Sequence, residues 1–310
     1  MFAAPRAVTT QVFARIPDGY RRAGRLSQER LQAGKGTLET DCYIEGPAFD
    51  REGNLYIVDI AFGDIYRISP RGEVARIAES DGEPNGLKIH RDGRIFVTDH
   101  KHGLLLLDPA TGSLTPEVAR YRTERFKGLN DLFFSSRGDL YFTDQGQTGL
   151  QDPSGRVYCL RAGGALECLL STVPSPNGIA LNPAENLLYI AATRANAIWR
   201  GLVLPDGGVT RVGLFIQMSG GAGPDGMAVD QQGNLLVAHA GMGAVWMFSP
   251  RGEPLLRIDS CQGPMTTNVA FGGKDNRDLY ITESESGCVL VVRLDIPGQI
   301  LYSHQPASRV

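Results

Sequence analysis

Residues 85–99, NGLKIHRDGRIFVTD, decide the fold of this chain of 310 residues. The alternating segment LKIH leads through a polar turn containing Gly93 into a second run, IFVTD, which is typical of two antiparallel strands. The pattern recurs in units that begin at Glu45, Asn85, Asn130, Asn177, Asp225 and Asn268. Six units, 40 to 48 residues apart and with room for four short strands in each, predict an all-β fold: a six-bladed β-propeller of four-stranded antiparallel blades around a central channel.

The ends of the chain must meet if the repeats form a propeller, whereas the competing architecture, a solenoid of stacked repeats, needs no closure. Residues 11–17, QVFARIP, are predicted to form the fourth strand of the sixth blade, and residues 300–304, ILYSH, compete for that place. We therefore expect residues 1–310 to form one domain, although about 150 residues per domain would suggest two.

Composition excludes several classes of protein. Hydrophobic residues make up 42% of the chain and charged residues 21%, which excludes wholesale disorder. The net charge of −3 provides no field for nucleic acid or an anionic membrane, so neither is expected as a partner. There is no run of eighteen apolar residues and no signal-peptide core in residues 1–19, which favours a cytoplasmic location. Five cysteines without a C-x-x-C pair are expected to be reduced and mostly buried.

The first residue of every unit is polar. Because the innermost strand of a blade lines the channel, these six residues should converge at one mouth of it. The second strand returns to the same face and ends at Asp59, Asp99, Asp144, Thr193, His239 and Glu283. Carboxylate and amide oxygens suit a hard divalent cation such as calcium, magnesium or manganese, while zinc and iron(II) stay open as alternatives.

A simpler interpretation applies to each position taken singly. Asn-Gly and Asp-Gly are ordinary turn dipeptides, and a propeller needs a turn before every inner strand. Glu45 is no turn former, however, and Asn130 is followed by Asp131 instead of glycine. Taken together, the six positions favour a metal or ligand site over a set of turns.

A resemblance to a known family rests on four of these positions: Glu45-Gly46-Pro47, Asn130-Asp131, Pro176-Asn177-Gly178 and Pro224-Asp225-Gly226. In this order and spacing they resemble the senescence marker protein, gluconolactonase and luciferin-regenerating enzyme family, which includes regucalcin and is related to the diisopropylfluorophosphatases. The similarity covers roughly residues 40 to 295. It implies a six-bladed propeller with one divalent metal ion in the central channel, commonly calcium and sometimes zinc or another ion.

The resemblance also implies roles for single residues. Glu45, Asn177 and Asp225 match the metal ligands, and Asp225 also matches the proposed general base or nucleophile. Asn130 matches a residue that contacts substrate or, in the phosphatase branch, also the metal. From their places in the repeat, Asn85 and His239 are further candidate substrate contacts.

The activity implied is that of a metal-dependent hydrolase, which opens a sugar lactone or a similar small cyclic ester with metal-activated water. A small-molecule lactone is then the partner, while the sequence says nothing of the oligomeric state. Two alternatives are a phosphotriester hydrolase at the same metal and a noncatalytic propeller that binds metal or a partner protein. An exposed apolar patch at the channel mouth would favour the last of these.

Several further features of the sequence each allow a functional and a nonfunctional interpretation. The loop 145–156 is a candidate lid or a solvent-exposed connection. The basic segment within 20–42 could attract a sugar acid or form a solvated surface. His100 and His102 could bind substrate or a second metal, or lie on the surface. Gly128 stands where some family members carry a substrate-contacting arginine, so an identical substrate is not implied.

Overall fold

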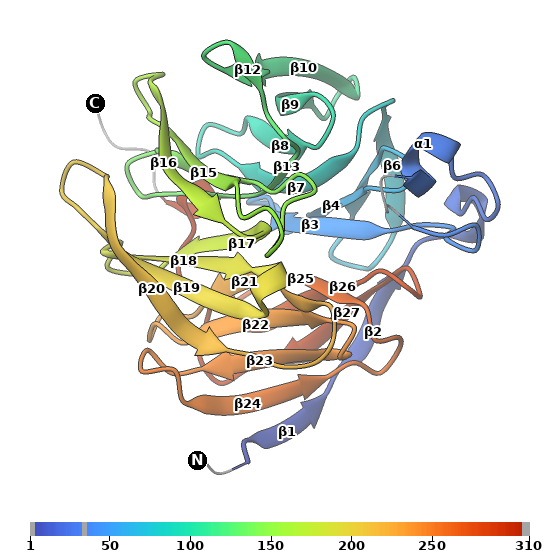
Figure 1. Ribbon diagram of the computed structural model, residues 1–310. Helices are drawn as coiled ribbons and strands as arrows, with labels where there is room; N and C mark the ends of the chain where they lie inside the picture. Colours follow the sequence, from blue (N-terminus) through green and yellow to red (C-terminus); the bar gives the residue numbers. More distant parts are fainter. Residues whose placement is uncertain (1–3, 33–35, 306–310) are drawn as a thin grey trace.

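Six four-stranded antiparallel blades stand around a common centre in the computed structural model, which describes residues 4–32 and 36–305 (Figure 1). The first strand of each repeat lies innermost, and the predicted six-bladed β-propeller is confirmed. The ends of the expected domain, 1–3 and 306–310, and residues 33–35 lie outside the described residues.

The first three blades follow the chain from the innermost to the outermost strand. Blade one contains β3 (Ile44–Phe49), β4 (Leu55–Asp59), β5 (Asp64–Ile68) and β6 (Val74–Glu79). Blade two contains β7 (Pro84–Ile89), β8 (Ile95–Asp99), β9 (Gly103–Asp108) and β10 (Ser113–Val118). Blade three contains β13 (Leu129–Phe134), β14 (Leu140–Asp144), β15 (Gly155–Leu160) and β16 (Leu166–Val173).

The other three blades repeat this order until the chain closes. Blade four contains β17 (Pro176–Leu181), β18 (Leu187–Ala192), β19 (Ala197–Val203) and β20 (Val209–Gln217). Blade five contains β21 (Gly223–Val229), β22 (Leu235–Ala240), β23 (Ala244–Phe248) and β24 (Pro254–Asp259). Blade six contains β25 (Thr266–Gly272), β26 (Asp278–Glu283), β27 (Cys288–Arg293) and the N-terminal strand β2 (Gln11–Arg15).

The N-terminal segment joins the first blade to the last. Strand β2 pairs antiparallel with β27, so a strand from the start of the chain completes blade six. The competing segment instead contains a 3-10 helix, η3 (Tyr302–His304). A further strand that the sequence did not suggest, β1 (Arg6–Thr9), pairs in parallel with β24 at the outer edge of blade five.

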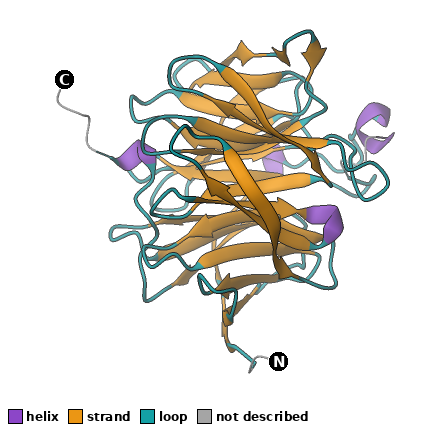
Figure 2. Cartoon of the chain, turned by 60° about the vertical axis from the view of Figure 1, so that its left-hand side comes forward, coloured by secondary structure: helices purple, strands orange, loops and turns teal. Residues whose placement is uncertain are grey.

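Few elements lie outside the blades. A short hairpin of β11 (Arg120–Tyr121) and β12 (Glu124–Arg125) connects blades two and three. The segment before blade one holds η1 (Asp18–Tyr20) and α1 (Gln28–Gln32), and η2 (Thr193–Ala195) follows β18. Figure 2 shows how strands and short loops make up almost all of the chain. No helix among the described residues is long and apolar enough to cross a membrane.

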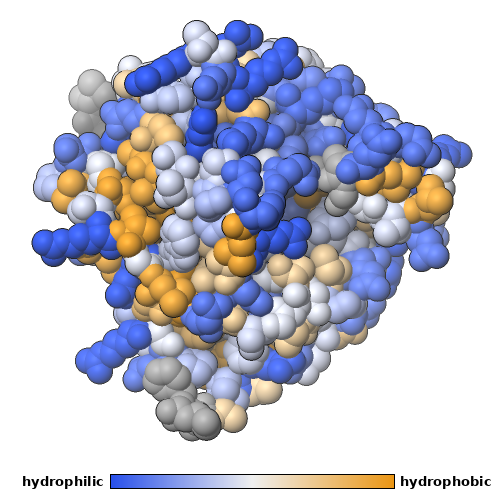
Figure 3. Space-filling view, viewed as in Figure 1, coloured by the Kyte–Doolittle hydropathy of each residue, from blue (hydrophilic) through white to orange (hydrophobic). Residues whose placement is uncertain are grey.

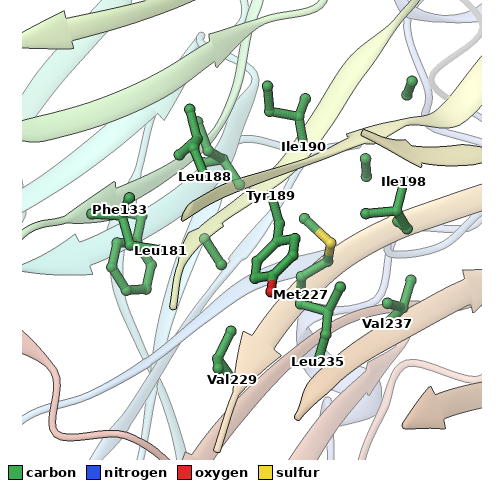
Figure 4. Close-up of a cluster of buried hydrophobic side chains, with 14 of the residues drawn as sticks. Phe133, Leu181, Leu188, Tyr189, Ile190, Ile198, Met227, Val229, Leu235 and Val237 are labelled. Carbon is green, nitrogen blue, oxygen red and sulfur yellow. The ribbon is translucent and has the colours of Figure 1, made fainter. Parts of the chain in front are cut away.

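The hydrophobic core lies between neighbouring blades. Successive side chains of a strand point to opposite faces, so each strand serves two interfaces. In β9, Leu105 and Leu107 pack toward blade one, whereas Leu104 packs toward blade three. Figure 4 shows the largest cluster, in which Tyr189 of blade four lies beside Met227 of blade five. Three of the five cysteines, all of them free, are buried, as expected.

Hydrophobic residues on the face seen in Figure 3 form separate groups among hydrophilic ones. The exposed leucines Leu202, Leu204 and Leu214 belong to the hairpin of β19 and β20 at the outer edge of blade four. Only two of the large exposed hydrophobic side chains, Leu38 and Leu150, come from the segments 20–42 and 145–156 that lead to the channel mouth.

Candidate active site

Each innermost strand is irregular where it enters the channel. The pairing with the second strand shifts between Glu45 and Ala48 in β3 and between Pro176 and Ile179 in β17, and β7, β13, β21 and β25 shift at corresponding places. A β-bulge re-aims the side chains beside it. The polar residue that opens each repeat therefore lies at a bulge.

The glycines that follow these residues lie inside strands, which excludes the interpretation of the dipeptides as turns. A Cβ atom on Gly46 would lie 2.7 Å from the carbonyl oxygen of Asn85, and one on Gly178 would lie 2.2 Å from that of Asp225. Glycine is required because the backbone of the next blade approaches so closely at the centre of the propeller.

Threonine hydroxyls tie neighbouring blades together at the same level. Thr143 Oγ1 donates a hydrogen bond to the carbonyl oxygen of Asn177 at 2.8 Å, and Thr193 Oγ1 donates to that of Pro224 at 2.7 Å. Each bond runs from one blade to the inner strand of the following blade. These contacts fix the backbone from which Asn177 and Asp225 project.

Five of the six predicted channel residues line one cavity of about 160 Å³: Glu45, Asn85, Asn130, Asn177 and Asp225. The other residues that line it are Tyr43, Ile60, Gln145, Thr193, Arg194, Ala222, Ala240 and Met265. The sixth predicted residue, Asn268, donates a hydrogen bond from Nδ2 to Glu45 Oε2 at 2.8 Å. It therefore supports Glu45 and is not part of the cavity wall.

Glu45 and Asp225 are buried carboxyl groups whose negatively charged forms are disfavoured in the cavity. Burial, with the neighbouring Asp131, raises the pKa of Glu45, although the Gly46 N–H and Asn268 oppose the rise. Burial, with Glu45 and Asp131, raises the pKa of Asp225 well above its ordinary value, although the hydrogen bond from Asn177 and the charge of Arg194 oppose this. Two desolvated carboxylates so placed would be ionised together only beside a positive charge.

A third carboxylate, Asp131, stands in blade three where four other blades have glycine. It is only 2% exposed, its oxygen accepts a hydrogen bond from the Leu132 N–H at 2.8 Å, and Lys88 Nζ lies 3.9 Å away. Burial raises the pKa of Asp131, and Lys88 opposes that rise. Asp131 does not line the cavity and acts on it through its charge.

Gln145 orients the side chain of Asn130. Asn130 Nδ2 donates to Gln145 Oε1 at 2.8 Å, and Gln145 Nε2 donates to Ser175 Oγ at 3.0 Å. Gln145 begins the loop 145–156, and no other residue of that loop lines the cavity, as far as the described chain shows. The loop therefore supplies one residue of the cavity wall.

Carboxylates of the outer polar ring accept hydrogen bonds from backbone N–H groups. Asp59 Oδ1 accepts hydrogen bonds from the N–H groups of Tyr43, Ala61 and Phe62. Glu283 Oε1 likewise accepts from the Met265 N–H at 3.2 Å. The ring thus holds the loops that carry the cavity residues Tyr43 and Met265.

His239 is not brought together with the other predicted residues. Its side chain is 2% exposed, and its Nε2 lies 3.0 Å from the carbonyl oxygen of Gly220. Burial lowers the pKa of His239, which favours the neutral ring. The next residue, Ala240, lines the cavity instead.

The two other candidate histidines, His100 and His102, lie outside this cavity and line a second one together. The His100 ring packs on Gly128, where a Cβ atom would lie 2.2 Å from His100 Nε2. A larger residue at position 128 would therefore collide with His100. His102 Nε2 lies 3.0 Å from Asp81 Oδ1. The two rings thus make different contacts, and neither lines the candidate active site.

Arginines of the basic segment before blade one are engaged in holding that segment in place. Arg21 makes two hydrogen bonds of 2.8 Å to Asp41, and Arg22 Nη2 lies 2.8 Å from Asp64 Oδ2. These pairs favour a structural role over attraction of a sugar acid. Lys35 of this segment lies outside the described residues.

Tyr43, Gln145, Arg194 and Met265 are cavity residues that the sequence reasoning missed. Burial, with Asp225 and Glu45, raises the pKa of Tyr43, so its phenol stays neutral and is able to donate a hydrogen bond. Tyr43 lies two residues before Glu45, and Arg194 follows the outer-ring residue Thr193. The only sign in the sequence that these residues reach the cavity was that they lie close to a repeat position along the chain.

No group of three or more His, Cys, Asp or Glu side chains that could hold a metal ion occurs within 4–32 and 36–305. The predicted ligands Glu45, Asn177 and Asp225 are two carboxylates and one amide, and so do not constitute such a group. They do share one cavity, with oxygen atoms of the kind that calcium, magnesium and manganese bind.

The chain is similar in sequence to known proteins. A model of the SMP-30/Gluconolactonase/LRE-like region matches residues 44–285. Gluconolactonase of Zymomonas mobilis subsp. mobilis is 32% identical over 277 residues, which cover 79% of this chain and 77% of that protein. Lactonase drp35 of Staphylococcus aureus strain USA300 is 33% identical over 227 residues, 69% of either chain.

Two solved structures share the fold. A calcium-binding protein, regucalcin, from Agrobacterium tumefaciens has a TM-score of 0.78 at 21% identity, over 98% of this chain and 100% of that one. A gluconolactonase from Xanthomonas campestris has a TM-score of 0.72 at 23% identity, over 96% of this chain and 100% of that one. At these identities the two structures bear on the fold alone.

Proposed function

The chain belongs to the SMP-30/gluconolactonase/LRE-like family, and from this premise we propose that it hydrolyses a lactone at the cavity of Glu45, Asn130, Asn177 and Asp225. The observation that carries the proposal is that four blades bring these residues to one cavity, as the resemblance requires. The names of two relatives, gluconolactonase and lactonase drp35, support the reaction class. A sugar lactone is the proposed substrate.

We propose that Glu45, Asn177 and Asp225 hold one divalent cation. The support is the donor set: oxygen ligands only, with two buried carboxylates that need a positive neighbour to be ionised together. Calcium ranks first, because the family resemblance most commonly implies calcium and oxygen ligands suit it, and zinc, magnesium, manganese and iron(II) are the alternatives. When bound, such an ion supplies a Lewis acid that polarises a carbonyl oxygen and stabilises developing negative charge.

Residues of the chain then carry out the proton transfer and orient the reacting groups. Asp225 accepts a proton from the attacking water, and the hydrogen bond from Asn177 orients its carboxylate. The hydroxyl of water joins the acyl carbon, the bond from that carbon to the ring oxygen breaks, and the ring oxygen takes up a proton. Lactone and water thus give one hydroxy acid, without an oxidant or reductant.

Amide and phenol groups of the cavity wall position the substrate in this proposal. Asn130, held by Gln145, and Asn85 present amides that can bond to hydroxyl or carbonyl oxygens. Tyr43 adds a neutral donor. His239 receives no role at the substrate, because it packs against Gly220 outside the cavity wall.

The noncatalytic alternative receives little support from the surface. The exposed leucines at positions 202, 204 and 214 belong to the outer edge of blade four, far along the blade from the innermost strands that form the cavity. The cavity wall itself is mostly polar and charged. Such a wall fits a small polar substrate better than an apolar partner surface.

Acid release from a panel of aldonolactones tests the proposal. Chelator-stripped protein would be assayed alone and with calcium, magnesium, manganese, zinc or iron(II) restored, beside a phosphotriester substrate. We expect turnover of at least one lactone, dependent on an added ion. Turnover of the phosphotriester alone, or of no substrate by folded protein, would contradict the proposal.

A further inference from the structure

Among the described residues that line the cavity, Arg194 alone carries a permanent positive charge. It lies in η2, the short turn after the second strand of blade four, and its residue is exposed. The turn is firmly held, since Thr193 Oγ1 donates to the carbonyl oxygen of Pro224 at 2.7 Å and the Asn196 N–H donates to that of Thr193 at 2.9 Å. The guanidinium thus starts from a fixed point on the cavity rim.

The Arg194 side chain makes no hydrogen bond or ion pair with any residue in the described part of the chain. Other arginines near the channel mouth differ in this respect. Arg21 pairs with Asp41, Arg22 pairs with Asp64, and Arg30 Nη2 donates to the carbonyl oxygen of Gly82 at 2.6 Å. Arg194 therefore has its hydrogen-bonding capacity available for a ligand.

The cavity carries charges of both signs, and the charge of Arg194 acts on Asp225. Glu45 and Asp225 lie on the inner strands β3 and β21, whereas Arg194 comes from a loop on the rim. An acidic group on a substrate would be repelled by the two carboxylates and attracted by Arg194. The planar guanidinium has paired N–H donors that match a carboxylate, which lysine or an amide cannot reproduce.

We propose that Arg194 binds a carboxylate of the substrate, so that the preferred substrate is a lactone with a carboxylate outside its ring, derived from a sugar diacid. The inference rests on the proposed lactone hydrolysis and adds a substrate class to it. The acidic group lies at the rim, and the ring carbonyl is directed toward Asp225. Arg194 is thus a residue that determines specificity and takes no part in proton transfer.

A matched pair of substrates tests this assignment. D-Glucono-1,4-lactone and D-glucaro-1,4-lactone have the same ring and differ in a terminal hydroxymethyl or carboxylate group. The metal-loaded protein, Arg194→Gln, Arg194→Lys and the control Arg251→Gln would be compared on both. Arg251 is exposed in the turn between β23 and β24, at the ends of these strands that lie away from the cavity.

We expect the unaltered protein to prefer the carboxylate-bearing lactone by about 10- to 100-fold in kcat/KM, the range for a hydrogen-bonded charged group. Arg194→Gln should remove this preference mainly through KM, with a clearly larger loss on the carboxylate-bearing lactone than on the neutral one. Arg194→Lys should restore part of the preference, and Arg251→Gln should behave like the unaltered protein. Equal use of both lactones, or an equal loss on both in Arg194→Gln, would overturn the inference.

A binding measurement tests the role of Arg194 even if the proposed lactone hydrolysis is wrong. If neither lactone is opened, competition between D-glucarate and D-gluconate for the metal-loaded protein measures the same preference without turnover. Tighter binding of glucarate that Arg194→Gln abolishes supports the assignment of Arg194. Equal binding of the two acids, or a preference that survives in Arg194→Gln, overturns it.

Discussion

At the scale of single residues, one repeat position serves different purposes in different blades. Glu45, Asn177 and Asp225 reach the cavity, while the equivalent Asn268 hydrogen-bonds Glu45 from the side. The next position is glycine wherever the following blade approaches closely, and Asp131 is the acidic exception. Sequence position alone predicts which residues converge, but not which of them face a ligand.

The two carboxylates of the proposed metal site give the first prediction. Asp225→Asn and Glu45→Gln should each lower kcat by about 100- to 10,000-fold, the range for loss of a proton acceptor or a ligand of the catalytic ion. In the metal-free protein, burial disfavours the charged forms of both carboxylates. The melting temperature of each metal-free variant should therefore be at least as high as that of the metal-free parent. Acid-release kinetics and melting curves of the same samples test this. Low activity together with a lower melting temperature would instead indicate damage to the fold.

Asp59 predicts a measurable dependence of stability on pH. Burial raises the pKa of Asp59 from 3.8 to about 7, although three backbone N–H groups oppose the rise. The folded state therefore binds more protons than the unfolded state between these values, and stability should fall as the pH rises from about 4 to about 7. Asp59→Asn keeps one acceptor oxygen and should remove up to about 4 kcal/mol of this change in the free energy of unfolding.

Denaturant unfolding at several pH values between 4 and 8 measures this difference. Asp206→Asn is a suitable control, because Asp206 is exposed and also accepts a backbone hydrogen bond, from Gly208 at 2.9 Å. The control should follow the parent at every pH. Identical pH profiles for Asp59→Asn and the parent would contradict the assignment.

At the scale of elements, the inner strands were predictable and the connections were not. Alternating segments around a polar turn identify the first two strands of every blade, because their pattern follows from burial on both faces. Strand β1 has four residues, mostly exposed, and a parallel partner far along the chain, so no local pattern indicated it. The turn η2 and the loop at Gln145 likewise have no periodicity, and their wall residues were missed.

The closing strand provides a prediction at this scale. Removal of residues 1–17 should greatly lower the melting temperature, because it deletes β2 and the buried Ala14 and Ile16. Removal of residues 1–9 deletes only the exposed β1 and should have a small effect. The point variant Ile16→Ala should cost about 2 to 5 kcal/mol. Differential scanning calorimetry compares the three, and an unchanged melting temperature without residues 1–17 would exclude closure by β2.

At the scale of the whole molecule, the ring closes around a small polar cavity instead of a continuous core. The hydrophobic core is divided among the blade interfaces, and this leaves the centre to polar side chains. Repeat spacing and register were enough to predict the propeller and five of the residues in the cavity wall. A sequence does not reveal that Asp59 and Glu283 of the outer polar ring accept hydrogen bonds from backbone N–H groups.

The central claim is that a divalent ion held by Glu45, Asn177 and Asp225 makes the cavity competent for lactone hydrolysis. Its most direct test is a titration of stripped protein with calcium, or with the most effective ion of the panel, in which acid release and bound metal are measured on the same samples. The account predicts that activity rises in proportion to bound metal and levels off at about one ion per chain, with no such rise in Asp225→Asn. Full activity in stripped protein, or equal metal binding and turnover in Asp225→Asn, would contradict it.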